Sequence, residues 1–86
     1  MAEEKSKLHL IIVDPDKIIY EGDALRVFAP GKIAELALLP QHTPLYSELT
    51  AGTIKVEEVS GGNQEFKIDG GVAKIQNNEL HILIGF

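Results

Sequence analysis

The chain has 86 residues, a net charge of −5 and no cysteine. This length allows one domain, the acidic balance argues against nucleic-acid binding, and the lack of cysteine excludes disulfides, thiolate catalysis and cysteine-based metal sites. No apolar run approaches the roughly 20 residues that span a bilayer. We expect one soluble domain over residues 8–86, preceded by a disordered polar leader at residues 1–7 without the apolar segment of a signal peptide.

The first third of the chain predicts three strands separated by a turn and a glycine. They cover residues 8–13, 18–20 and 24–29. In the first of them, alternation places Leu8, Leu10 and Ile12 on one face. A proline between two aspartates predicts the turn at residues 14–17. Gly22 is expected to end the second strand before the third begins.

The central segment, residues 29–45, contains three of the four prolines. A Pro-Gly pair turns the chain before a strand expected at residues 33–39. Pro40 and Pro44 then fix φ and favour extended residues before them, which predicts a shaped loop. Residues 44–49 could hold a single helical turn.

The second half of the chain reads as four more strands with glycine and asparagine turns between them. These strands are expected at residues 53–59, 64–69, 72–76 and 79–84. Residues 60–63 and Asn77-Asn78 are hairpin turns, and Gly70-Gly71 marks a bulge or a tight bend. Turn signals every ~8–12 residues predict an all-β fold of eight to ten short antiparallel strands, arranged as a sandwich or flattened barrel.

No residue pattern points to chemistry. His9, His42 and His81 lack the spacing of metal ligands, so we predict no metal site. Ser47 and two threonines lie near His42, but no strand–turn–helix nucleophile elbow surrounds them. The Gly-Gly pairs lack the lysine of a phosphate loop. We therefore expect no catalytic residue and no cofactor.

The aliphatic residues are more numerous than a half-solvated sandwich needs. Leu, Ile and Val number 25, and residues 11–13, 18–19 and 36–39 do not alternate as a sheet with one wet face should. Irregular burial at the sheet edges is one explanation. We favour the other, that a protein partner covers part of the outer surface.

The central segment also carries an ordered set of prolines, glycines, one acid and one histidine. Its members are Pro30-Gly31, Glu35-Leu36, Leu39-Pro40, His42 and Pro44-Leu45, followed later by Gly70-Gly71. This order resembles the epsilon subunit of F-type ATP synthases, and residues 8–15 and 20–22 are similar to that family's first hairpin. The resemblance extends over residues 8–84.

The resemblance implies a ten-stranded β-sandwich that contacts the gamma shaft with one side and the membrane c-ring with one end. The interface residues it implies are Gly31, Glu35, Pro40, His42 and Pro44. It further implies a non-catalytic rotor subunit that couples ion-driven rotation to ATP synthesis, at the cytoplasmic face of the inner (plasma) membrane. The membrane would be reached only through the complex.

This sequence departs from the family pattern at several positions. Ala34 and Ala37 flank the Glu-Leu pair where glycines are usual, and Asp69 replaces a serine. Family members commonly continue into a C-terminal helical hairpin, whereas this chain stops at Phe86. We expect it to be either a naturally short form or a truncated piece of a longer chain, and both readings stay open. Two other functions stay open: a small β-sandwich adaptor that binds a protein or ligand, and a small hydrolase using His42.

Overall fold

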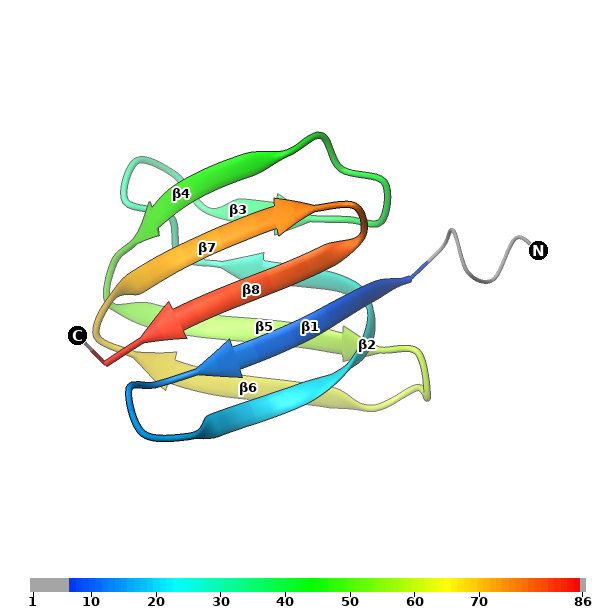
Figure 1. The fold of residues 1–86 in the computed structure, drawn as a ribbon, viewed down its shortest axis with the longest axis horizontal. Helices are drawn as coiled ribbons and strands as arrows, with labels where there is room; N and C mark the ends of the chain where they lie inside the picture. The colour runs from blue at the N-terminus through cyan, green and yellow to red at the C-terminus, as the bar shows by residue number, and fades with distance from the viewer. Residues whose placement is uncertain (1–6, 86) are drawn as a thin grey trace.

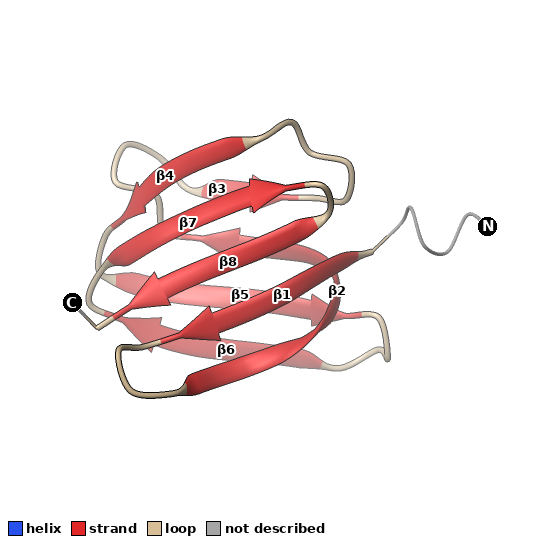
Figure 2. Cartoon of the chain, viewed as in Figure 1, coloured by secondary structure: helices blue, strands red, loops and turns tan. Residues whose placement is uncertain are grey.

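The computed structural model describes residues 7–85. The predicted leader at residues 1–7 therefore lies outside the described residues except for Lys7, as does Phe86. All regular elements in the described range are strands (Figures 1 and 2), so no helix there could cross a membrane. The eight strands are β1 (Leu8–Val13), β2 (Ile18–Ala29), β3 (Leu36–Leu38), β4 (Leu45–Leu49), β5 (Gly52–Glu58), β6 (Asn63–Ile68), β7 (Gly71–Gln76) and β8 (Glu79–Ile84).

The strands form two layers, which confirms the all-β sandwich. Hydrogen-bonded neighbours follow the order β4-β7-β8-β1-β2-β5-β6, and β3 also pairs with β2. The front layer in Figure 1 contains β4, β7, β8, β1 and the first half of β2, and the second half of β2 lies behind with β3, β5 and β6. The eight strands of the described range fall at the lower end of the expected eight to ten.

One long strand joins the two layers, where the sequence had predicted two strands divided at Gly22. Residues of β2 pair with β1 as far as Ala24, and β2 pairs with β5 from Ala24 to Phe28. The pairing with β5 is irregular between Ala24 and Arg26, where a bulge lets the strand change layer. Gly22 stays inside the strand because the Tyr20 ring covers it: a methyl group there would lie 2.8 Å from the Tyr20 hydroxyl.

The predicted strand at residues 33–39 is mostly a loop. Only Leu36–Leu38 pair with β2, and residues 32–34 bend outward with Ile33 fully exposed. The bend exists because the carbonyl of Ala34 folds back over Gly31, where a side chain would collide with it. A sequence rich in alanine and leucine gave no sign of this reversal.

Residues 45–49 form strand β4, and the suggested helical turn at residues 44–49 is wrong. All five residues of β4 pair with β7. On its other side β4 meets the chain after β2: the amide of Thr50 donates to the Pro30 carbonyl, and that of Lys32 to the Glu48 carbonyl. Because both edges of β4 find partners, the extended form satisfies more backbone groups than one helical turn would.

Local turn chemistry was predicted correctly at the hairpins. In the β7–β8 turn Asn77 and Asn78 have φ of 55° and 61°, the left-handed values that asparagine tolerates. In the β1–β2 turn the Asp14 carboxylate accepts from the amides of Asp16 and Lys17. One pairing departs from the antiparallel expectation, because β1 and β8 run parallel. They come from opposite ends of the chain, and no turn determines their direction.

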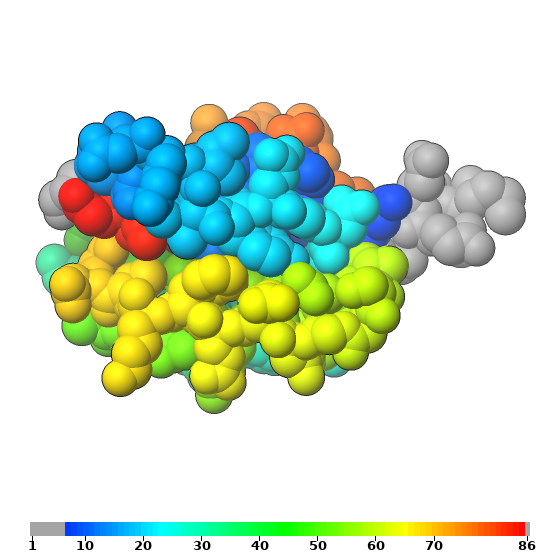
Figure 3. All heavy atoms as spheres, turned by 90° about the horizontal axis from the view of Figure 1, so that it is seen from below, coloured from blue at the N-terminus to red at the C-terminus, as the bar shows by residue number. Residues whose placement is uncertain are grey.

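The core lies between the layers and is entirely aliphatic. Leu8, Leu10 and Ile12 are fully buried, as their alternation predicted. On the lower side of the sandwich β2 and β6 adjoin without pairing (Figure 3), and each of these strands contributes one half-buried aromatic ring that packs against the core. There the ring centroids of Tyr20 and Phe66 are 5.4 Å apart.

Candidate protein-binding face

The front layer leaves an aliphatic row on its outer surface. Alternation sends the core residues of β1, β7 and β8 inward, so their other side chains face outward. The register then places Val72 beside Leu83, Leu83 beside Val13 and Val13 beside Ile18. Leu83 is 43% exposed and Ile18 58%, while both valines are half-buried. We call these four residues the apolar row.

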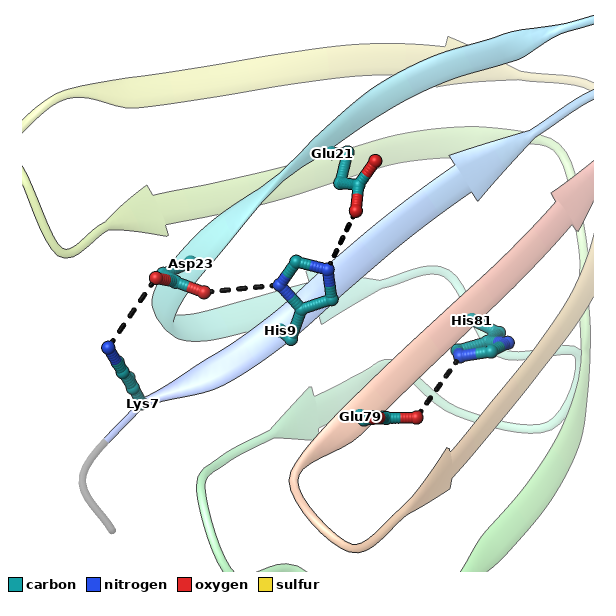
Figure 4. Close-up of polar contacts among 6 residues, drawn as sticks. All are labelled: Lys7, His9, Glu21, Asp23, Glu79 and His81. Carbon is teal, nitrogen blue, oxygen red and sulfur yellow. Dashed lines mark hydrogen bonds and ion pairs between the residues drawn. The ribbon is translucent and has the colours of Figure 1, made fainter. Parts of the chain in front are cut away.

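Charged and polar residues predominate in the next two rows of β1, β2, β7 and β8, with Ile11 as the aliphatic exception. The next row contains Lys74, His81, Ile11 and Glu21, and the row beyond it contains Gln76, Glu79, His9 and Asp23. Figure 4 shows how the second of these rows meets the first at His9, on β1. The outer surface is therefore apolar at the end near the β1–β2 turn and charged at the other.

His9 lies between two carboxylates of β2. Its Nδ1 is 3.2 Å from Asp23 Oδ1, its Nε2 is 2.9 Å from Glu21 Oε2, and Lys7 Nζ is 3.6 Å from the second Asp23 oxygen. Hydrogen bonds with Asp23 and Glu21 raise the pKa of His9 above its usual value of 6.5. The His9 hydrogen bond and the Lys7 charge lower the pKa of Asp23. Protonated His9 is thus the form that this arrangement stabilises.

The face is suited to binding a protein and carries no arrangement for catalysis. Both ring nitrogens of His9 are engaged by carboxylates, so neither is directed at a substrate. Across residues 7–85 no three His, Cys, Asp or Glu side chains are grouped to hold a metal ion. An aliphatic row rimmed by charges is instead the usual composition of a contact surface between proteins.

The structure places the five residues that the resemblance implied for the interface in two separate groups. Gly31 and Glu35 precede β3, whereas Pro40, His42 and Pro44 follow it. Since β3 is extended, its two ends lie roughly 10 Å or more apart. In Figure 1 the loop before β3 lies at one end of the sandwich and the loop after β3 at the other. These five residues therefore do not form one continuous patch.

The end that carries Glu35 also carries three other turns. These are residues 14–17, 50–51 and 69–70 (Figure 1). Glu35 is exposed, and Gly31 is buried in a bridge to Leu49. Beside them an open hollow of about 440 Å³ is lined in part by Ile33, Leu36 and Tyr46. We call this surface the Glu35 end.

The opposite end holds His42 in a loop that rests on the β7–β8 turn. The amide of Gln41 donates to Asn78 Oδ1 at 2.5 Å, and the His42 amide donates to the Leu39 carbonyl. The His42 ring is half-buried and its Nδ1 donates to the Thr43 carbonyl at 2.7 Å. The Ser47 hydroxyl donates to the Glu48 carbonyl. The Thr43 carbonyl engages only Nδ1 of His42, but the Ser47 hydroxyl is bonded to backbone and not to this ring, so the two side chains are not arranged as a nucleophile and its base.

The sequence analysis identified only two of the four residues of the apolar row. Val13 and Ile18 belong to runs that were recognised as too hydrophobic, whereas Val72 and Leu83 were not singled out. A leucine on the outward phase of residues 79–84, beside Glu79 and His81, was the available signal. The parallel pairing of β1 with β8 assembles the row, and no local pattern predicts that pairing.

Comparisons with known proteins match nearly the whole chain. Residues 7–85 match the family model described as ATP synthase, Delta/Epsilon chain, beta-sandwich domain. The chain is 34% identical over 76 residues to the ATP synthase epsilon chain of Bordetella parapertussis, an alignment that covers 88% of this chain and 54% of the relative. For the Campylobacter fetus epsilon chain the identity is 38% over 77 residues, with 90% and 60% covered. The chain thus spans a little over half the length of these relatives.

Two solved structures share the fold. One chain of the Euglena gracilis mitochondrial ATP synthase, solved as OSCP/F1/c-ring, superposes with a TM-score of 0.86 at 20% identity, covering 92% of this chain and 51% of that one. One chain of the Tetrahymena thermophila ATP synthase central stalk and c-ring gives a TM-score of 0.74 at 21% identity, covering 95% and 66%. At these identities the likeness concerns the fold alone.

Proposed function

We propose a role for this chain from the family to which it belongs, the β-sandwich domains of ATP synthase delta and epsilon chains. It acts as a non-catalytic rotor subunit in the central stalk of an F-type ATP synthase. It binds the gamma shaft and the c-ring, and it transmits ion-driven rotation between them without chemistry of its own. An alternative role as an adaptor for another protein would use the same outer surface.

The apolar row is the observation that carries this proposal. Four aliphatic side chains from β1, β2, β7 and β8 lie in register across one outer surface, and two of them are more than 40% exposed. Covering such residues is favourable by about 25 cal/mol per Å² of apolar area. A rigid sheet that presents an apolar row to a shaft can carry torque, because the contact involves strands and not mobile loops. We assign the gamma shaft to this surface.

The Glu35 end is assigned to the c-ring. Its turns carry the carboxylates of Asp14, Asp16, Glu35 and Asp69 and fewer basic residues. Basic polar loops of a ring would complement this charge, although each exposed pair adds only ~0–1 kcal/mol. In this arrangement Gly31 shapes the loop that holds Glu35. Pro40, His42 and Pro44, at the opposite end, would contact the shaft or the catalytic head.

This role places the chain at the cytoplasmic face of the membrane as a peripheral component. Contact with the membrane is made through the ring, and we expect the isolated chain to be soluble. Cell fractionation tests this placement: we expect the chain in the membrane fraction only when the remainder of the complex is present.

Gel filtration with the cognate gamma subunit tests the proposal. At micromolar concentrations we expect one peak that contains both proteins. Two separate peaks under these conditions would contradict the role. Binding of the chain to detergent-solubilised c-ring, compared between the wild type and Glu35→Gln, tests the second contact independently.

A further inference from the structure

The charged half of the outer surface indicates what kind of segment covers the apolar row. Glu21 and Asp23 both project outward from β2, opposite Ile11 and His9 of β1. With a rise of roughly 3.3 Å per residue, Glu21 lies about 10 Å along the strand from Ile18. A partner segment that covers Ile18 and Val13 and runs along β2 therefore reaches Glu21 within about three or four residues when extended, or about seven when helical.

The acidic charge gathers on the β2 side of this surface. The Lys7 ammonium lies 3.6 Å from the Asp23 carboxylate, and the Glu21 carboxylate is hydrogen-bonded to the ring of His9. Lys74 belongs to β7, and strands β8 and β1 separate it from β2, a distance of roughly 14 Å. When His9 is protonated, it and Lys7 balance the two carboxylates. When His9 is neutral, one negative charge is left over.

Resting on the proposed function, we propose that the segment covering the apolar row carries a lysine or arginine that pairs with Glu21, and that protonated His9 competes with it. Charge complementarity favours a basic segment over an acidic or neutral one. The incoming cation takes the carboxylate that His9 holds, so binding favours the neutral imidazole. Affinity for the partner therefore rises with pH as His9 loses its proton.

Every strand near His9 contributes titratable or charged groups to this balance. They are Lys7 on the approach to β1, Glu21 and Asp23 on β2, Glu79 and His81 on β8, and Lys74 on β7. Glu79 lies opposite His9 across the β1–β8 pairing, and its oxygen is 3.7 Å from His81 Nε2 (Figure 4). Because His81 is a second imidazole on this surface, a variant of His9 is needed to isolate the effect.

The test is the dissociation constant for the gamma subunit at pH 6.0 and 8.5, measured for the wild type and for His9→Gln. We expect wild-type binding to be roughly threefold tighter at the higher pH, in keeping with one exposed ion pair. His9→Gln removes most of this difference, because position 9 then carries no ionisable group while all other groups of the two proteins are the same. At pH 8.5 Glu21→Gln weakens binding about twofold to fivefold. Glu65→Gln, an exposed acid on the opposite layer, is the matched control and leaves it unchanged.

The outcomes separate this inference from the function on which it rests. Failure of gamma to bind at any pH overturns the rotor role and the inference together. Tight binding that is equal for wild type, Glu21→Gln and Glu65→Gln leaves the role in place and overturns the basic contact. An equal pH dependence for wild type and His9→Gln overturns the competition by His9.

Discussion

The Tyr20 hydroxyl donates a hydrogen bond of 2.6 Å to the carboxylate of Glu58, thirty-eight residues further along the chain. Tyr20 belongs to the front half of β2 and Glu58 to the end of β5, so the bond ties the layers together where β2 and β6 do not pair. Burial and the Glu58 carboxylate raise the pKa of Tyr20 to about 12. The neutral phenol is therefore the form that the fold stabilises.

Replacing Tyr20 with phenylalanine removes this bond and keeps the ring against Phe66. We expect Tyr20→Phe to lower the free energy of unfolding by about 0.5–1.5 kcal/mol, measured by urea denaturation. A double-mutant cycle with Glu58→Ala, which removes the acceptor, gives the coupling between the two groups. Equal effects of Tyr20→Phe in the wild-type and Glu58→Ala backgrounds would show that the bond contributes nothing to stability.

A methyl group at Gly31 tests the reversal of the loop before β3. The Ala34 carbonyl occupies the space of that methyl group, so Gly31→Ala should lower the free energy of unfolding by about 1–3 kcal/mol. Ala34→Ser on the same loop is the control, since its side chain is exposed. A Gly31→Ala protein as stable as the wild type would mean that the loop is not folded back.

The β7–β8 turn anchors the loop that contains His42, through the amide of Gln41. Asn78→Gly suits the left-handed φ of 61° but removes the oxygen that accepts from this amide. We expect hydrogen exchange at the Gln41 amide to accelerate severalfold. Asn77→Gly, at φ of 55° in the same turn, should leave that exchange rate unchanged. Equal rates in the two variants would contradict the anchoring bond.

The pairing of His9 with Asp23 predicts a bell-shaped dependence of stability on pH. His9 has a raised pKa, so its contribution is complete below its unfolded value of 6.5 and is lost as the pH rises through the folded value. Asp23 has a lowered pKa, so its contribution is present above its unfolded value of 3.8 and is lost as the pH falls through the folded value. The free energy of unfolding of His9→Gln should therefore fall furthest below that of the wild type between pH 3.8 and pH 6.5. The difference should be below ~1 kcal/mol, because the pair is exposed. Thermal melts across this range measure the difference, and a constant difference from pH 3 to pH 9 would contradict it.

Local signals in the sequence were sufficient for most strands and turns. The prolines, the glycines and the Asn-Asn pair punctuate the chain at the places where the structure turns, and alternation identified the buried face of β1. Three elements were predicted wrongly because tertiary contacts decide them. Gly22 was expected to end a strand, but Tyr20 packs over it, and residues 33–39 were expected to be extended, but the Ala34 carbonyl folds back over Gly31. The helical turn suggested at residues 44–49 is a strand because it pairs with β7.

The candidate site was harder to predict than the fold. Glu35 and His42 lie seven positions apart in the sequence, yet an extended β3 carries them to opposite ends of the sandwich. The apolar row, in contrast, collects Val13, Val72 and Leu83 from distant parts of the chain through the parallel β1–β8 pairing. Such a row depends on strand order, which hydrophobic periodicity does not contain.

The central claim, that the apolar row binds the gamma shaft, is tested most directly by the affinity of one charged variant. Leu83→Asp places a carboxylate in the row, where the leucine side chain is 43% exposed. The control, Val59→Asp, places a carboxylate outside the row, at a valine of the β5–β6 turn that is 46% exposed. We expect both variants to fold, and Leu83→Asp to weaken gamma binding at least ~tenfold, because aliphatic burial is lost and a charge is desolvated. Val59→Asp should bind as the wild type does. A folded Leu83→Asp protein that binds gamma with wild-type affinity would contradict the account.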